Sequence, residues 1–343
     1  MRRIAWGVAA LLLIMVVLTG CGQKNAADIV SDLSKRSEKM EGYTTKAKMT
    51  IHTGSTPQIY EVEVWYKQPH FYRVSLKNTK KDITQILLRN DDGVYVLTPH
   101  LNKSFRFQSD WPESSGQIYL YQSLINSIID DQSRGFKAGS DGYQFDVRAK
   151  TNNQTLSRQR IWLNKDLYPT KAELLNDQDQ VMVEVTFDRF NIDPSFDKDA
   201  FDMNRNMTGL NDQVLPSMRN AQTDKDRHSE KEVQTMVPGY VPKGSRLVDE
   251  QSVDSMEGEV VIMRYQGKQP FTLTQKNPDA VQASAPMYGQ PVDLGYTVGV
   301  LLEGSEKKRL SWTHNGTDFE LYGNLPVAEM VKIAQSVQDQ PQK

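Results

Sequence analysis

The residues best suited to metal binding or proton transfer are scattered along this sequence. Its five histidines are His52, His70, His100, His228 and His314. None of them forms the His-x-x-x-His or His-Glu-x-x-His spacing of a zinc site, and the chain has no Gly-x-Ser-x-Gly elbow, phosphate loop or dinucleotide fingerprint. Residues 195–198 and 305–308 match Ser-x-x-Lys, but no Lys-Thr-Gly accompanies them, and so short a pattern is expected by chance. We therefore expect a protein that is not an enzyme and has no metal and no cofactor.

Cys21 is the only cysteine, and its surroundings predict that it is lipidated. Arg2 and Arg3 precede an almost unbroken apolar run over residues 4–18, which ends in a Thr-Gly dipeptide before Cys21. This order resembles the bacterial lipobox, and the run is shorter than the roughly 20 residues that a membrane-spanning helix needs. We expect residues 1–20 to be removed as a signal peptide and Cys21 to carry diacylglycerol and palmitate, at the outer face of the cell membrane. In the alternative, an uncleaved anchor helix leaves the rest of the chain on the same side.

The composition fits an exported protein of about two domains that is held together by its core. Once Cys21 is lipidated, no thiol is left for a disulfide or a metal site. The 343 residues carry a formal net charge of −2, which gives no overall attraction to nucleic acid. After residue 20 no second apolar segment is long enough to predict a membrane span.

Periodicity predicts an N-terminal unit of antiparallel strands with two helices. Residues 25–39 and 118–128 have apolar side chains at helical spacing. The remaining segments alternate apolar and polar residues in short runs separated by polar turns, which is typical of an antiparallel meander. The clearest alternation covers residues 181–187, where every second residue is Val or Phe.

A smaller C-terminal unit is predicted after a polar linker. The linker covers residues 203–236, which are rich in Asn, Asp, Gln, Ser and Lys. The unit is expected to end in a helix over 326–337. Its strands are expected over residues 259–265, 271–275, 296–302, 309–314 and 318–322.

Short motifs in the N-terminal unit resemble the lipoprotein-carrier superfamily typified by LolA, LppX and RseB. Residues 66–73 look like its aromatic-x-x-Pro and Phe-x-Arg stretch, residues 92–96 like its next hairpin, and residues 161–169 like a later strand–turn–strand. The chain departs from the superfamily after Phe201, where Asp-Met-Asn stands in place of an expected Pro. It resembles in particular the sporulation-associated, carrier-like lipoproteins of Bacillus, which include GerS-like germination lipoproteins. The C-terminal unit, which opens with Pro-Gly-Tyr at 238–240, is similar to a small domain of Gram-positive anti-sigma-type proteins.

The resemblance implies an α+β fold. A strongly curved antiparallel sheet, an incomplete β-barrel, would be closed by helices and followed by a small α+β domain. The implied boundaries are a signal peptide over 1–20, a LolA-like half-barrel over 25–202, a linker over 203–236 and a C-terminal domain over 237–343. The apolar interior of such a half-barrel can hold acyl chains, since burial of each CH2 group contributes about 0.8 kcal/mol.

Twelve apolar residues at alternating strand positions are predicted to face this interior. They are Met49, Ile51, Val62, Val64, Val74, Leu76, Leu87, Phe145, Val147, Val183, Val185 and Phe187. These side chains can line an empty cavity or simply fill a core, because alternation indicates burial and not empty space.

Two further groups of residues have both a functional and a structural interpretation. The tryptophans are expected either to gate a cavity or interface or to pack as core residues; they are Trp65, Trp111, Trp162 and Trp312. The acidic stretches 91–93 and 176–179 fit hairpin turns better than calcium sites. Asp130 and Asp131, at the expected end of the second helix, are predicted to be solvated.

The leading hypothesis is a membrane-tethered, non-enzymatic lipoprotein that binds a protein partner in a cell-envelope, sporulation or germination process. The alternative is a lipid- or lipoprotein-binding carrier whose cargo fills the apolar half-barrel cavity. A tethered protein can hand cargo across only a short distance, which favours partner binding. The expected contacts are therefore the membrane through Cys21, a protein partner, in the alternative an acyl-chain ligand, and no nucleic acid.

Overall fold

The computed structural model describes residues 25–339, apart from 53–56, 81, 108–110, 112–116, 152–155, 209–234, 256–257, 278–288, 295–296 and 315. Cys21, the predicted signal peptide over 1–20 and most of the predicted linker over 203–236 lie outside these residues. Within the described part of the chain, no helix is both long enough and apolar enough to cross a bilayer.

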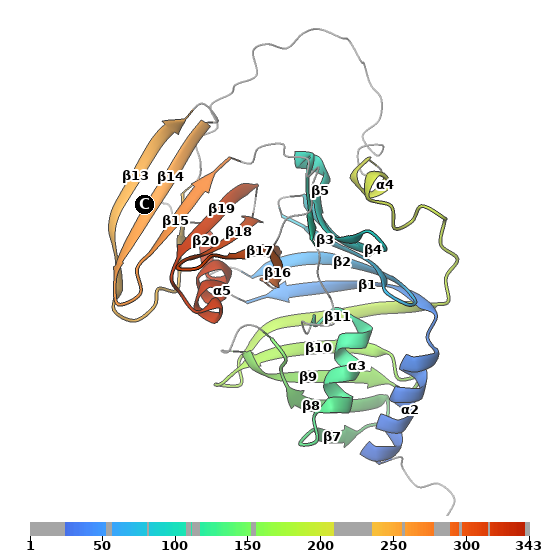
Figure 1. The fold of residues 1–343 in the computed structure, drawn as a ribbon. Coiled ribbons are helices and arrows are strands. Elements are labelled where there is room, and N and C mark those ends of the chain that lie inside the picture. Colours follow the sequence, from blue (N-terminus) through green and yellow to red (C-terminus); the bar gives the residue numbers. More distant parts are fainter. Residues whose placement is uncertain are drawn as a thin grey trace, which may run out of the picture.

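The N-terminal unit is built on one antiparallel sheet of eleven strands (Figure 1). The strands are β1 (Gly42–Ile51), β2 (Gln58–Lys67), β3 (Phe71–Asn78), β4 (Ile83–Asn90), β5 (Gly93–Thr98), β6 (Lys103–Phe107), β7 (Gly135–Ala138), β8 (Gly142–Arg148), β9 (Leu156–Asn164), β10 (Pro169–Asn176) and β11 (Val181–Ile192). Their order is β6-β5-β4-β3-β2-β1-β11-β10-β9-β8-β7, so the chain starts at the centre, runs to one edge, crosses to the other and returns. The predicted antiparallel arrangement is confirmed, and because β6 and β7 are edges the sheet is not closed into a barrel.

Two helices cover the part of this sheet that contains β7 to β11 (Figure 1). They are α2 (Ala26–Lys39) and α3 (Tyr121–Asp130), with α3 against β8 and α2 against α3. α2 begins at a capping box, in which the Asn25 side chain accepts from Asp28 N (3.0 Å) and the Asp28 carboxylate accepts from Asn25 N (3.2 Å). Ile29 and Leu33 of α2 and Leu124 of α3 are fully buried, so the predicted apolar faces are the ones that pack.

The other face of β4 and β5 is covered by the segment that follows β11. Phe201 and Met207 pack there with apolar residues of both strands, and Met207 belongs to the short helix α4 (Met203–Thr208). Arg73 of β3 holds this helix, because its Nε donates to Asn206 Oδ1 (2.6 Å) while its Nη1 lies 3.0 Å from Glu63. The chain after Phe201, where the superfamily has a Pro, is therefore a helical turn fixed to the sheet.

The C-terminal unit contains a second antiparallel sheet of seven strands, a helix and a two-stranded ladder. The sheet is formed, in order, by β13 (Ser245–Ser255), β14 (Gly258–Gly267), β15 (Phe271–Lys276), β19 (Thr317–Gly323), β18 (Lys308–His314), β17 (Val298–Glu303) and β16 (Gln290–Asp293). The ladder joins β12 (Met236–Pro238) to β20 (Val337–Asp339), and the helix is α5 (Val327–Gln335). The five predicted strands correspond to β14, β15, β17, β18 and β19, and the predicted helix to α5.

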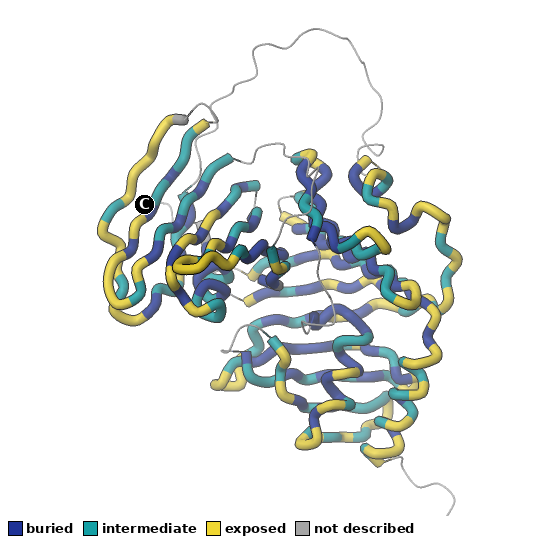
Figure 2. Tube along the Cα trace, in the orientation of Figure 1, coloured by how far each residue is buried: buried dark blue, intermediate teal, exposed yellow. Residues whose placement is uncertain are grey.

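β13 lies outside the predicted strands because it does not alternate apolar and polar residues. It is an edge strand, and Figure 2 shows it exposed along most of its length beside the buried inner strands. Leu247, Val248 and Val253 remain between 41% and 44% exposed. An edge strand with little to bury leaves no periodic signal in the sequence.

Asp131, at the end of α3, is buried, and the prediction that it is solvated is wrong. Its side chain is only 6% exposed, and its carboxylate accepts from Ser133 N (2.9 Å), Ser133 Oγ (2.7 Å) and Arg148 N (2.8 Å). Burial raises the pKa of Asp131, but these hydrogen bonds outweigh burial and lower the pKa from 3.8 to about 2. Asp130, 54% exposed and paired with Lys150, is solvated as predicted.

Replacing Asp131 by Asn should lower the free energy of unfolding at pH 7 by about 2 kcal/mol, since one pKa unit corresponds to about 1.4 kcal/mol. The pKa is lower in the folded state than its ordinary value of 3.8, so this stabilisation is present above about pH 3.8 and is lost as the pH falls toward 2. Urea unfolding of wild type and Asp131→Asn across this interval should show the difference shrinking. Asp130→Asn, at the exposed neighbour, should change stability by less than about 1 kcal/mol. Equal effects from both variants would contradict the role assigned to Asp131.

Candidate functional site

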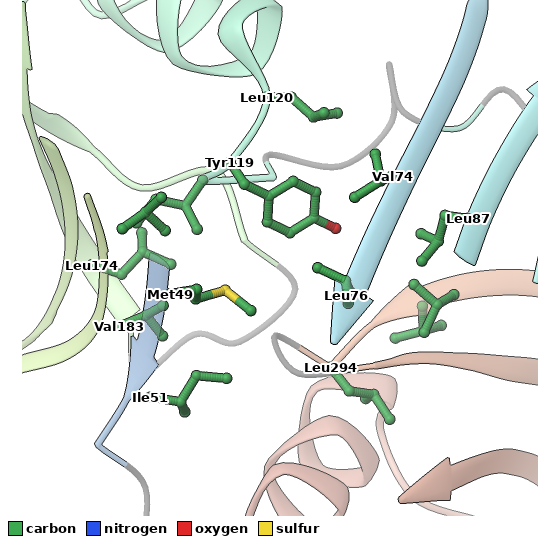
Figure 3. Close-up of a cluster of buried hydrophobic side chains, with 14 of the residues drawn as sticks. Met49, Ile51, Val74, Leu76, Leu87, Tyr119, Leu120, Leu174, Val183 and Leu294 are labelled. Atoms are coloured by element: carbon green, nitrogen blue, oxygen red, sulfur yellow. The ribbon is translucent and has the colours of Figure 1, made fainter. Parts of the chain in front are cut away.

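All twelve residues predicted to face the interior are buried in one apolar cluster, with exposed fractions from 0% to 5%. Figure 3 shows Met49, Ile51 and Val183 gathered around the same interior as Leu76 of β3. Leu294 of the C-terminal unit reaches this interior too, so the cluster extends across both units. The burial agrees with the alternation in the sequence, whereas a ligand cavity lined by these side chains stays a prediction.

The other sequence candidates have structural roles. Residues 91–93 and 176–179 form the β4–β5 and β10–β11 turns, as predicted. Trp111 and Trp312 are buried, and the rings of Trp65 and Trp162 lie under the guanidinium groups of Arg73 and Arg160. In the part of the chain that the structure describes, His, Cys, Asp and Glu side chains form no group of three that could hold a metal ion.

A cleft of about 550 Å³ lies between the two units. The first sheet contributes residues of β4, β5 and β6, and the second sheet contributes residues of β14, β15 and β17 to β19. The lining residues are Gln85, Val96, Thr98, Lys103, Phe105, Val260, Thr274, Lys276, Val298, Val300, Leu302, Arg309, Ser311, Trp312, Thr313, Asp318, Phe319 and Glu320. This volume falls within the usual range of ligand pockets, and none of the twelve predicted cavity residues lines it.

The register of the second sheet divides the floor of the cleft into a polar and an apolar part. Ser311 of β18 lies opposite Glu320 of β19, and Glu320 lies opposite Thr274 of β15, which gives a row of polar side chains. On the other side of Ser311 lies Val300 of β17, a strand that contributes Val298, Val300 and Leu302 to the cleft. The floor is therefore amphipathic, and it faces Val96 and Phe105 of the first sheet.

A buried ion pair joins the two units beside the cleft. Lys103 Nζ lies 2.5 Å from Asp318 Oδ2, and the two side chains are only 8% and 13% exposed. Thr313 Oγ1 donates to the other carboxylate oxygen of Asp318 (2.6 Å), and the Lys103 ammonium lies 5.0 Å from the centre of the Phe105 ring. Such a pair fixes relative orientation more than it adds stability, because desolvation offsets much of its Coulombic attraction.

Gln85 makes the second polar contact between the units. Its Oε1 accepts from Thr297 Oγ1 (2.8 Å) and from Val298 N (3.2 Å), and all three groups are buried. Val298 begins β17, the strand that supplies the apolar part of the cleft floor, and Thr297 directly precedes it. The contact therefore holds this floor directly against the first sheet.

The cleft has the chemistry of a binding site. Trp312 and Phe319 border the cleft, but they alternate with Ser311 and Glu320 along β18 and β19, so their stacked rings, with centres 5.1 Å apart, pack into the buried core on the other face of the sheet. Hydroxyl and carboxylate groups line one side of the floor, and the aliphatic groups of β17 line the other. This arrangement suits an amphipathic ligand or a peptide segment.

The sequence alone gave no sign of this site. Its central contacts join residues 215 and 212 positions apart, as in Lys103 with Asp318 and Gln85 with Thr297. A lysine that begins a strand looks the same in sequence whether it is solvated or buried. The alternation of apolar and polar residues predicts the positions of β17 and β18. It does not predict which surface of the first sheet these strands face.

Comparison with known proteins places the chain among sporulation proteins. Residues 1–201 match the family described as "Sporulation protein YdcC-like", and residues 235–337 match a domain of unknown function, DUF4367. "Sporulation protein YdcC" of Bacillus subtilis (strain 168) is 41% identical over 337 residues, covering 97% of this chain and 96% of that protein. These matches confirm the predicted resemblance to a family of sporulation-associated proteins that includes a Bacillus member.

More distant similarities are found among solved structures. A chain of the Pseudomonas aeruginosa MucA/MucB complex is 14% identical and covers 93% of this chain and 100% of its own length, with a TM-score of 0.34. A chain of the Clostridioides difficile CwlD amidase–GerS lipoprotein complex is 15% identical and covers 52% and 99%, with a TM-score of 0.30. The LolA superfamily protein NE2245 from Nitrosomonas europaea is 12% identical and covers 53% and 99%, also with a TM-score of 0.30. At these scores the family assignment rests on the sequence matches.

Lys103→Ala should lower the free energy of unfolding by about 3–5 kcal/mol, because it leaves the buried Asp318 carboxylate without its counter-charge. The double variant Lys103→Met/Asp318→Leu should stay within about 1 kcal/mol of wild type, since apolar side chains of similar size replace the pair. As a control, Arg309→Ala removes an ion pair with Glu320 whose side chains are 47% and 48% exposed, and it should cost less than about 1 kcal/mol. Urea unfolding measures all three. A loss for Lys103→Ala no larger than that for Arg309→Ala would show that the units do not meet through this pair.

Proposed function

Because this chain belongs to the YdcC-like sporulation proteins, we propose that it is a non-enzymatic binding protein of the sporulating cell envelope. It is anchored to the outer face of the cell membrane by diacylglycerol and palmitate on Cys21. From there it engages a protein partner in sporulation or germination. Its eleven-stranded sheet is strongly curved into a half-barrel, as in the carrier superfamily.

The observation that supports partner binding is the cleft to which both units contribute. A segment of a partner that enters it meets aliphatic side chains on β17 and a row of polar side chains on β15, β18 and β19. Apolar anchors surrounded by polar groups are typical of the central part of protein interfaces. The Lys103–Asp318 pair fixes the relative orientation of the two walls of the cleft. The site is therefore formed before a partner binds, which lowers the entropic cost of binding.

The carrier alternative requires free access to the interior of the first sheet. This interior is covered by α2 and α3 over β7 to β11 and by the C-terminal unit at β3 and β4, whereas the cleft lies over β5 and β6. Leu294 already packs in the cluster that contains Leu76 and Leu87. Cargo loading there would require the units to separate and the buried ion pair to break, so the geometry supports partner binding over cargo transport.

The anchor is tested by Cys21→Ser. Loss of the acylated sulfur removes the covalent anchor, since two acyl chains on one cysteine give stable anchoring. We expect wild-type protein to stay in the membrane fraction through a high-salt wash, which screens electrostatic contacts, and the Cys21→Ser chain to be released by it into the soluble extracytoplasmic fraction. Mass spectrometry of the wild-type N-terminus should show a diacylated Cys21, and an unmodified cysteine would disprove the anchor.

Partner binding is tested by filling the cleft. Ser311→Trp places a large side chain on its floor, whereas Thr186→Trp introduces the same side chain in place of another hydroxyl residue at an exposed position of β11. In cross-linked pull-downs from sporulating cells, a partner captured by wild type should be retained by Thr186→Trp and reduced at least 10-fold by Ser311→Trp. Melting temperatures of both variants establish that they are folded.

The same preparation distinguishes the carrier. Native mass spectrometry with lipid extraction, on the Cys21→Ser chain purified from cells in high salt, should show protein without bound acyl lipid. Stoichiometric co-purified lipid together with unchanged partner capture by Ser311→Trp would replace the partner-binding proposal with the carrier.

A further inference from the structure

A second pocket, of about 420 Å³, lies between α2 and the strand ends that it crosses. Four cations surround it: Lys35, Arg36 and Lys39 of α2, and Lys165 in the turn between β9 and β10. Two carboxylates, those of Asp32 and Asp193, also line it, so the pocket has a formal charge of +2 in a chain whose net charge is −2. This local excess of positive charge favours an anionic ligand.

Ion pairing does not account for these cations. Among the described residues, none of the four has a carboxylate within 4.0 Å, whereas Arg160 and Lys171 on the same sheet each pair with two carboxylates. Two of the four are instead positioned by neutral partners. Arg36 Nη1 donates to Tyr168 Oη (2.7 Å), and Lys165 Nζ donates to Gly139 O (2.8 Å).

Two tyrosine rings support these side chains. The Arg36 guanidinium lies 5.0 Å from the centre of the Tyr168 ring, and the Lys165 ammonium lies 5.1 Å from the centre of the Tyr143 ring. Both rings line the pocket beside the cations. Guanidinium and ammonium groups together are typical ligands of phosphate, and tyrosine is enriched where proteins meet lipid headgroups.

The position of the pocket in the chain connects it with the membrane. α2 starts at Ala26, and residues 22–25 extend at most about 14 Å from Cys21. If Cys21 is acylated, as proposed above, Lys35 lies within about 30 Å of the anchor, because α2 rises only 1.5 Å per residue, and the pocket is within reach of the bilayer surface. We propose that this pocket binds the phosphate group of an anionic phospholipid in the membrane that carries the anchor. A second contact of this kind fixes the orientation of the molecule on the membrane, which a flexible anchor cannot do.

Part of the basic character has a simpler origin. Arg36 and Lys39 lie in the last turn of α2, where positive charges also offset the helix dipole. The dipole explains a small effect on helix stability, and it predicts no affinity for vesicles. Vesicle binding therefore separates the two origins.

The test uses the mature Cys21→Ser chain, which has no acyl group, and sedimentation with vesicles. We expect binding to vesicles of phosphatidylglycerol and phosphatidylcholine and little binding to phosphatidylcholine alone. Lys35→Gln/Lys39→Gln should weaken binding about 30-fold, at about fivefold for each charge lost near an anionic surface. The control Lys46→Gln/Lys48→Gln removes the same charge from two exposed positions on β1 and should leave binding within about twofold.

Three results would overturn the proposal. The first is no preference for phosphatidylglycerol, and the second is an equal loss in both double variants, which would indicate attraction without a site. The third is saturable binding of inorganic phosphate, measured by calorimetry, without binding to vesicles, which would make the ligand a soluble phosphate. Because the assay uses a chain without an anchor, its failure and a failure of Cys21 acylation are observed separately.

Discussion

The N-terminal unit depends on the pairing of β1 with β11. β1 opens the sheet and β11 ends it, so this one ladder joins the two halves that the chain builds in succession. Its register places Met49 opposite Val185 and Ile51 opposite Val183, which puts four apolar side chains on one face. A shift by one residue would turn this face toward solvent, and burial of the apolar face therefore specifies the register. The remaining strands pair outward from this ladder on both sides, and α2 and α3 pack on the half that begins with β11.

The contact between the units follows a different physical logic. The core of each unit is apolar and Leu294 continues it across the contact, but the units also meet through a buried ammonium–carboxylate pair and a buried amide. Polar groups of this kind are costly to leave unpaired, so they tolerate few alternative orientations. The cleft owes its shape to this restriction, because its two walls belong to separate sheets. A wholly apolar contact of the same area could also hold the two walls together. It would allow more than one relative orientation of the walls.

The sequence predicts what is periodic and misses what is not. The alternation over 181–187 and the helical spacing of 25–39 locate β11 and α2, and all twelve predicted interior residues are buried. β13 is missed because an exposed edge strand has no buried face to mark. The burial of Asp131 is not predicted, because it depends on hydrogen bonds from Ser133 and Arg148. Arg148 lies on a separate strand, and the spacing of apolar residues does not indicate this contact. The cleft depends on residues more than 200 positions apart, and a single sequence contains no information on that pairing.

The long exposed edge strand β13 can promote association between copies of this protein at high concentration. Strand edges with free amide and carbonyl groups are templates for adding another strand, and a run of 11 residues is long for an edge. Glu250 and Asp254 place negative charge along it, so two copies that approach edge to edge repel each other. This repulsion weakens in concentrated salt, and under that condition two copies would begin to pair through their β13 edges.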